Sequence, residues 1–196
     1  MQDFVFYSNK FNLNDLAEKE KSLGNNEVVL CKNFSDAELA ELKNKLKEKF
    51  SVKFFTCFLL LKMNSKELNK FKNKTDFIGV LGGNVSINKF AVTDKRIDFL
   101  IKPCIEGRLS FDTAIARIAK ENSTEILIPF SQFLNSGYSS RVSLTKNYVF
   151  CLKIAKKFKL NYSVISFAGN LNELRSLKDL QSFKNFLEKK FESALK

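Results

Sequence analysis

The stretch that decides the fold runs from residue 35 to residue 62 and reads SDAELAELKNKLKEKFSVKFFTCFLLLK. Its first part predicts an amphipathic helix, because Ser35 can cap the N-terminus and Glu38 stands three residues on, as in a capping box. This helix would turn one row of apolar side chains inward, formed by Leu39, Leu42, Leu46 and Phe50. Residues 52–62 are apolar on both faces, which is typical of a parallel strand covered on both sides. A helix followed by a buried strand is the repeating unit of an α/β fold.

The same alternation extends outward in both directions along the chain. Six further strands are predicted, over residues 3–8, 27–34, 76–83, 97–103, 124–130 and 161–169. Helices are expected over residues 14–21, 65–72, 111–122 and 143–158, and from residue 170 to the end. No linker or compositional break interrupts the chain, so we expect a single domain over residues 1–196.

About seven strands joined by helices imply a parallel sheet. Periodicity alone is equally compatible with an open, doubly wound sheet and with a closed barrel. A barrel built from 196 residues would be compact and imperfect, because such barrels usually need about 250 residues.

Composition excludes several classes of protein. No apolar run approaches the roughly 18 residues of a membrane span, and the N-terminal MQDFVFYSNKF does not have the layout of a signal peptide. We therefore expect a cytoplasmic protein with no membrane partner. The four cysteines are far apart and form no CxxC pair, so we expect buried, reduced thiols and no zinc site.

The charge is strongly basic and unevenly distributed. The net charge is +12, and residues 141–196 carry 12 basic side chains against 4 acidic ones. Such a balance suits a polyanion, since each neutralised phosphate releases counterions. However, 28 of the 33 basic residues are lysine, which is also what an AT-rich genome would encode. On charge alone, an RNA-binding protein and a barrel that binds only protein are both open.

The absence of histidine limits the possible chemistry. A chain with no histidine can neither build imidazole metal clusters nor use histidine as a general base. Carboxylates can still hold Mg²⁺, but the predicted strand ends LGGN, IKPC, IPFS and ISFAGN carry no acid. No serine has an evident base partner. The Gly82–Gly83 pair can approach a phosphate or form a tight turn, and the lack of a GxGxxG or P-loop pattern favours the turn.

The basic residues near the C-terminus are better organised. Arg141, Lys146, Lys153 and Lys157 recur at helical spacing. Arg96, Arg141 and Arg175 each stand at the edge of an element, where a guanidinium can meet a phosphate. A helix after Leu180 has an apolar stripe, which we expect to pack on the barrel, with a contact to a partner protein as the alternative; it consists of Phe183, Phe186, Leu187 and Phe191.

The second half of the chain resembles the ribonuclease P protein component 3 family, the 30-kilodalton subunit shared by archaea and eukaryotes. Three segments carry the resemblance and follow one another in the family's order: residues 79–103, 140–166 and 167–183. The family pattern falls on a set of motif residues, which are Gly82, Gly83, Asn88, Asp98, Arg141, Ser166, Arg175 and Asp179. The chain departs from it at three places. Strand residues 126–130 lack the usual acid, Phe167 replaces a serine, and Leu177 replaces a proline.

The resemblance implies a distorted triosephosphate-isomerase-type barrel, a relative of the polymerase and histidinol phosphatase barrels without their metal ligands. It also implies a subunit with no catalytic residue and no cofactor of its own. The RNA subunit would use Mg²⁺ to remove 5′ leaders from precursor tRNA, while this chain and component 2 stabilise that RNA.

For RNA contacts we select basic residues by charge, position and fit to the family. They are Lys95, Arg96, Arg141, Lys146, Lys153, Arg175 and Lys178, with Gly82, Gly83, Asn88, Asp98, Ser166 and Asp179 as structural motif residues. The alternative function is a barrel phosphoesterase that uses carboxylates and Mg²⁺.

Overall fold

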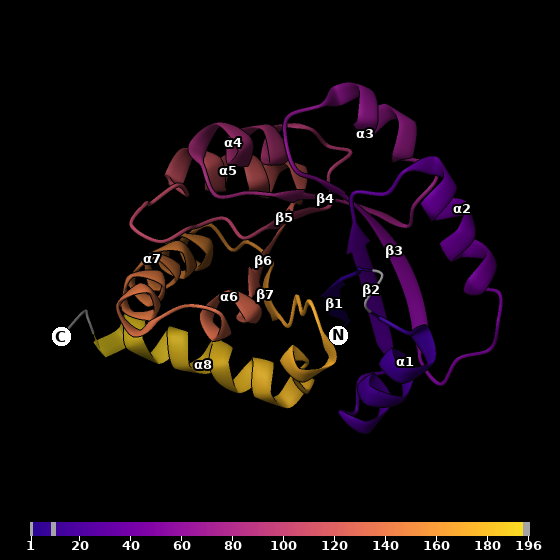
Figure 1. The fold of residues 1–196 in the computed structure, drawn as a ribbon. Helices are drawn as coiled ribbons and strands as arrows, with labels where there is room; N and C mark the ends of the chain where they lie inside the picture. Colours follow the sequence, from indigo (N-terminus) through magenta and orange to yellow (C-terminus); the bar gives the residue numbers. More distant parts are fainter. Residues whose placement is uncertain (1, 9–10, 194–196) are drawn as a thin grey trace.

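A computed structural model describes residues 2–8 and 11–193 of the chain. Its sheet has seven parallel strands that pair in sequence order and curve into a ring (Figure 1). They are β1 (Asp3–Phe6), β2 (Glu27–Lys32), β3 (Lys53–Leu60), β4 (Phe77–Leu81), β5 (Phe99–Ile101), β6 (Glu125–Pro129) and β7 (Tyr162–Ile165). All seven predicted strands are confirmed.

Helices connect the strands and lie outside the ring (Figure 1). They are α1 (Leu13–Ser22), α2 (Asp36–Lys45), α3 (Ser65–Phe71), α4 (Val85–Thr93), α5 (Thr113–Asn122), α6 (Phe130–Leu134), α7 (Tyr138–Lys157), the 3₁₀ turn η1 (Leu171–Glu173) and α8 (Leu177–Ser193). Among the described residues, no helix is both long and apolar enough to cross a membrane.

Backbone hydrogen bonds join the two edges of the sheet and close it into a barrel. The segment that follows β7 returns to β1, where Val5 and Ala168 form a parallel bridge. The Phe6 N–H donates to the Ala168 carbonyl at 3.0 Å, and the Phe167 N–H donates to the Phe4 carbonyl at 2.7 Å. Periodicity left open and closed sheets equally possible, and these non-local pairs resolve the choice.

The inside of the barrel is filled by alternate side chains of the strands. A compact apolar cluster occupies it, made up of Phe4, Val29, Cys31, Cys57, Leu59, Phe99, Ile101, Leu127 and Ile165. A Cβ on Gly79 would lie 3.1 Å from Cys57 Sγ and 3.2 Å from Ile101 Cδ1, which is tight packing. The barrel is therefore a packed core rather than a pore, as in larger barrels of this type.

A second apolar core lies between the strands and the helices, and α2 and α8 contribute to it as the sequence predicted. The capping box of Ser35 and Glu38 is present, and Leu39 and Leu42 are buried while Leu46 is only half-buried. The helix α8 packs inward through Leu187 of the stripe and through Leu180, which are both buried. The predicted packing of α8 on the barrel is thus confirmed.

Three helix boundaries differ from those predicted. The helix α2 ends at Lys45 rather than near Phe50, because the chain must turn back so that the Lys53 N–H can reach the Asn26 carbonyl at 2.9 Å. The helix α7 begins at Tyr138, earlier than predicted. The chain after β7 is not helical throughout, since η1 and an extended link precede α8.

All four cysteines are buried and free, as expected. Cys31 and Cys57 are register partners on β2 and β3, inside the barrel. Burial raises the pKa of the Cys31 thiol well above its usual value, so this thiol stays protonated and behaves as a small apolar group.

Candidate nucleic-acid interface

The Gly82–Gly83 turn after β4 is held by Asn88 of α4. Asn88 Oδ1 accepts from the Gly83 N–H at 3.1 Å, while its Nδ2 donates to the carbonyls of Pro103 and Ser110 at 2.7 Å each. The Gly82 N–H donates to the Ile101 carbonyl at 2.8 Å. Both glycine amides therefore have partners inside the protein. The favoured interpretation, a tight turn rather than a phosphate cradle, agrees with this geometry.

Asp94 and Asp98 lie at the opposite end of the barrel, where the strands begin. Asp98 Oδ2 accepts from the Ile78 N–H at 2.8 Å, which joins β4 and β5 at this end. Asp94 pairs with the guanidinium of Arg96, which holds the pKa of Asp94 below its usual value. These carboxylates therefore serve the backbone and a neighbouring cation.

Ser166 and Arg175 belong to a buried polar network at the closure of the barrel. Asp3 Oδ1 accepts from the Ser166 N–H at 2.8 Å, and Ser166 Oγ accepts from the Arg175 N–H at 3.1 Å. From the other side, Asn25 Nδ2 donates to the Arg175 carbonyl at 3.2 Å and to Glu20 Oε2 at 2.5 Å. The backbone of Arg175 is thus fixed through both of its polar groups.

The guanidinium groups of Arg141 and Arg175 are also oriented by the protein. Arg141, in the first turn of α7, donates to the carbonyls of Phe133 and Leu134 at 2.8 and 3.0 Å. Arg175 donates from Nη1 to the carbonyls of Asn172 and Leu174, and its guanidinium lies 5.6 Å from the Phe130 ring centroid. Each group uses two of its five N–H donors in these bonds.

Five of the predicted RNA-contact residues lie on α7, on α8 or directly before α8. The helices α7 and α8 lie side by side (Figure 1) and contact each other directly, with a salt bridge from Lys156 to Glu188 at 3.1 Å. We call the basic residues of this region the α7–α8 basic face; they are the exposed Arg141, Lys146, Lys153 and Lys178, and the half-buried Arg175 that precedes α8. Ser176 caps the start of α8, because its Oγ accepts from the Asp179 N–H at 3.1 Å and donates to Asp179 Oδ2 at 2.7 Å.

Lys95 and Arg96 do not join this surface. They lie in the link from α4 to β5, at the end of the barrel where strands begin, whereas Arg141 and Arg175 follow the ends of β6 and β7. Arg96 is also engaged by Asp94 and by Asn69 of α3. The structure thus separates Lys95 and Arg96, in the link from α4 to β5, from the five predicted contact residues on or beside α7 and α8.

A cavity of about 470 Å³ lies at the carboxyl end of the strands, and no sequence motif predicted it. We call it the barrel mouth; the described residues that line it include Phe6, Leu81, Lys102, Gln132, Phe167 and Glu173. The available signal was Lys102, a lone lysine directly after the buried strand β5. Among the residues the structure describes, no group of three or more His, Cys, Asp or Glu side chains is arranged to hold a metal ion.

Comparison with known proteins gives consistent matches. The family model described as RNase P subunit p30 matches residues 7–196. The chain is 29% identical over 159 residues to ribonuclease P protein component 3 of Methanocaldococcus jannaschii, an alignment that covers 79% of this chain and 68% of that protein. It is 28% identical over 118 residues to the protein of the same name from Methanothermobacter thermautotrophicus, covering 60% and 48%. The chain spans about half the length of the first curated relatives it matches.

A solved structure shares the fold. A chain of the cryo-EM structure of archaeal ribonuclease P with mature tRNA superposes with a TM-score of 0.78 at 24% sequence identity. The superposition covers 98% of this chain and 87% of that one. At this identity the likeness establishes the barrel architecture.

Proposed function

The chain belongs to the RNase P subunit p30 family, and from this premise we propose that it is a protein subunit of ribonuclease P. In this role it binds the catalytic RNA in the cytoplasm, together with protein component 2, and has no catalytic centre of its own. The RNA subunit uses Mg²⁺ to remove the 5′ leader of precursor tRNA, which this chain meets only indirectly. The observation that carries the proposal is the family match over residues 7–196.

The α7–α8 basic face supplies the physical means of binding RNA in this proposal. Lysine and arginine side chains on neighbouring helices can follow a phosphate backbone, and such contacts position an RNA without reading its sequence. Arg141 is held in place by two backbone carbonyls, so little side-chain entropy is lost when it meets a phosphate. Lys95 and Arg96 would contact a separate part of the RNA, since they lie in the link from α4 to β5 and not on α7 or α8.

The experiment that tests the proposal is cleavage of precursor tRNA by the cognate RNA at limiting Mg²⁺. Component 2 is present throughout, and this chain is added or withheld. We expect the chain to increase the rate of leader removal, and the mixture of proteins without RNA to cleave nothing. Indifference of the rate to the chain would contradict the proposal. Metal-dependent cleavage by the proteins alone would instead favour the phosphoesterase alternative.

A further inference from the structure

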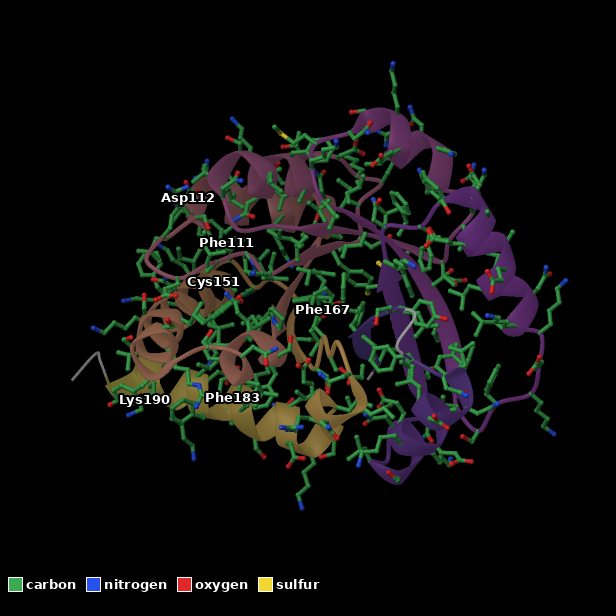
Figure 2. The ribbon with its side chains drawn as sticks, viewed as in Figure 1. Phe111, Asp112, Cys151, Phe167, Phe183 and Lys190 are labelled. Atoms are coloured by element: carbon green, nitrogen blue, oxygen red, sulfur yellow. The ribbon has the colours of Figure 1, made fainter. Side chains whose placement is uncertain are left out.

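The floor of the barrel mouth is aromatic and partly open to solvent. Phe6 ends β1 and is 38% exposed, whereas Phe4 on the same face of the strand is buried. The aromatic ring centroids of Phe6 and Phe167 lie 5.7 Å apart, and the two ring planes meet at 53°. Phe167 lies near the middle of the barrel (Figure 2). Leu81 and Pro129 extend this apolar lining. A flat apolar ligand could cover these rings and remove them from water.

Lys102 lines the barrel mouth together with these aromatic rings and has an unusual backbone conformation. Lys102 has φ +58° and Phe167 has φ +45°, and these are two of the four non-glycine residues with positive φ among those described. Left-handed conformations are rare for side chains of this size and concentrate where function requires them. The Lys102 N–H is fixed by the Leu127 carbonyl at 2.9 Å. Within the described part of the chain, no acceptor is found for the half-buried Lys102 ammonium group, which is therefore available to an anion.

The remaining side of the barrel mouth is polar and already ordered. Gln132 Oε1 accepts from the Tyr148 hydroxyl at 2.7 Å, which orients the amide and presents its NH₂ group as a donor. Glu173 is the single carboxylate among the described lining residues. Its oxygens accept from the Gly169 N–H at 2.8 Å and from Asn135 Nδ2 at 3.1 Å. This wall can thus both donate to and accept from the polar edge of a ligand.

We infer that the barrel mouth binds one unpaired nucleotide of an RNA, with its base against Phe6 and Phe167 and its phosphate on Lys102. The inference rests on the proposed function and adds a specific contact to it. A nucleotide combines the flat ring, the polar edge and the anion that this cavity offers, and single-stranded RNA is commonly bound by stacking on aromatic side chains. The volume of about 470 Å³ falls in the usual range for ligand sites.

The surroundings of the barrel mouth favour RNA over a protein partner. The helices α7 and α8 both start at the carboxyl end of the strands, where the mouth lies, and Arg141 and Lys178 stand in their first turns. The whole chain carries a net charge of +12. An RNA strand that follows the α7–α8 basic face would therefore pass the mouth, where an unstacked base can enter. An apolar side chain of a protein partner would use Phe6 but would have no need of Lys102.

The test is an NMR titration of the ¹⁵N-labelled full chain with the four nucleoside monophosphates, the four nucleosides and inorganic phosphate. We expect the monophosphates to shift the signals of Phe6, Lys102 and Gln132, with the nucleosides and phosphate each binding at least tenfold more weakly. Phe6→Leu keeps an apolar side chain but removes the ring, and Lys102→Gln removes only the charge. Phe6→Leu should weaken binding at least about fivefold, in line with the contribution of stacking a single base. Lys102→Gln should weaken it by at least about the same factor, because the charge-assisted contact to the phosphate is lost.

Lys49→Gln, in the link from α2 to β3, is the matched control, because it removes one exposed positive charge at the end of the barrel where strands begin; it should leave the affinity unchanged. The inference is overturned if the mouth signals do not move, if phosphate alone reproduces the shifts, or if Phe6→Leu binds like the unchanged chain. Preferential binding of an acidic or aromatic peptide at the mouth would also overturn it.

The outcome can be separated from that of the proposed function. If the chain stimulates leader cleavage but no nucleotide binds at the mouth, the inference fails and the proposed function stands. If nucleotides bind at the mouth and the chain leaves cleavage unaffected, the proposed function fails and the nucleotide site stands.

Discussion

Asp3 and Glu20 are two fully buried carboxyl groups at the closure of the barrel. Burial raises the pKa of Asp3 to about 6, and burial together with the charge of Asp3 raises the pKa of Glu20 to about 8. One oxygen of each, Asp3 Oδ2 and Glu20 Oε1, has no hydrogen-bond partner among the described atoms. The folded state therefore prefers these groups protonated. Their contribution to stability is complete at low pH and is lost as the pH rises from about 4 through 8.

Glu20→Gln should remove most of this pH dependence, because glutamine resembles the protonated acid. We expect the variant to match the unchanged chain in free energy of unfolding near pH 5 and to exceed it near pH 9 by a few kcal/mol, since one pKa unit corresponds to about 1.4 kcal/mol. Urea unfolding at the two pH values measures this difference. Glu18→Gln, at an exposed position of the same helix, is the control and should show no such gain. Equal stability of the variant and the unchanged chain at pH 9 would contradict the prediction.

Gly82 is the glycine with the least room for a side chain. A Cβ there would lie 2.3 Å from Asn88 Oδ1 and 2.7 Å from Leu100 Cδ1, so Gly82→Ala must displace Asn88 and weaken its three hydrogen bonds. We expect a loss of about 2–4 kcal/mol in the free energy of unfolding. Gly137→Ala, where nothing lies within 4 Å, should cost less than about 1 kcal/mol. Similar losses for the two variants, measured by chemical denaturation, would show that Asn88 does not constrain the turn.

At the scale of elements, the start and the first turns of α8 are fixed by specific contacts, in addition to the buried Leu180 and Leu187. Its start is fixed where Asn25 Oδ1 accepts from the Leu177 N–H at 3.2 Å. Its first turns are fixed by Phe183, whose ring lies edge-on to those of Phe130 and Phe133, with centroids 4.9 Å away in each case. Because Arg175 and Lys178 flank the start of α8, this docking also sets the position of part of the basic face.

Phe183→Ala should therefore loosen α8 and destabilise the fold. We expect a loss of about 2–3 kcal/mol, below the range for fully buried phenylalanines because this ring is only partly covered. Phe186 belongs to the same stripe, and its side chain is 44% exposed. Phe186→Ala should therefore lower the free energy of unfolding by less than about 1 kcal/mol. Hydrogen exchange of the α8 amides, together with denaturant unfolding, distinguishes the two variants. The reverse order of effects would mean that α8 is held elsewhere.

At the scale of the whole molecule, charge position rather than total charge should govern RNA binding. In the double variant Lys146→Gln/Lys178→Gln, the slope of log affinity against log salt should become shallower by roughly 0.7–0.9 for each phosphate that is no longer neutralised. The double variant Lys62→Gln/Lys66→Gln removes the same charge around α3 and should leave the slope unchanged. A filter-binding or anisotropy series over several salt concentrations gives both slopes. Equal changes in the two would mean that the lysines act only through net charge.

The sequence by itself determined the strand–helix order and much of the local structure. Residues 35–62 specify a capped helix and a doubly buried strand through short-range signals, and these signals survive in the tertiary structure. The glycine turn at residues 82–83 was also predictable, because its geometry depends on local backbone conformation. The burial of the four cysteines followed from the apolar runs around them. The RNA-contact residues stay predictions, chosen by charge and by resemblance.

Only the tertiary structure decided what depends on residues far apart in the chain. Closure of the barrel rests on Val5 and Ala168, which no periodicity can pair. The buried network joins Asp3, Glu20 and Arg175, which are far apart in the sequence. The raised pKa values of the two acids therefore could not be predicted from sequence pattern. The barrel mouth likewise assembles Phe6, Lys102 and Phe167 from three separate strand ends. Hydrophobic pattern is a local property, whereas a closed sheet and a shared cavity arise from long-range packing, and this difference separates what the sequence alone could specify from what it could not.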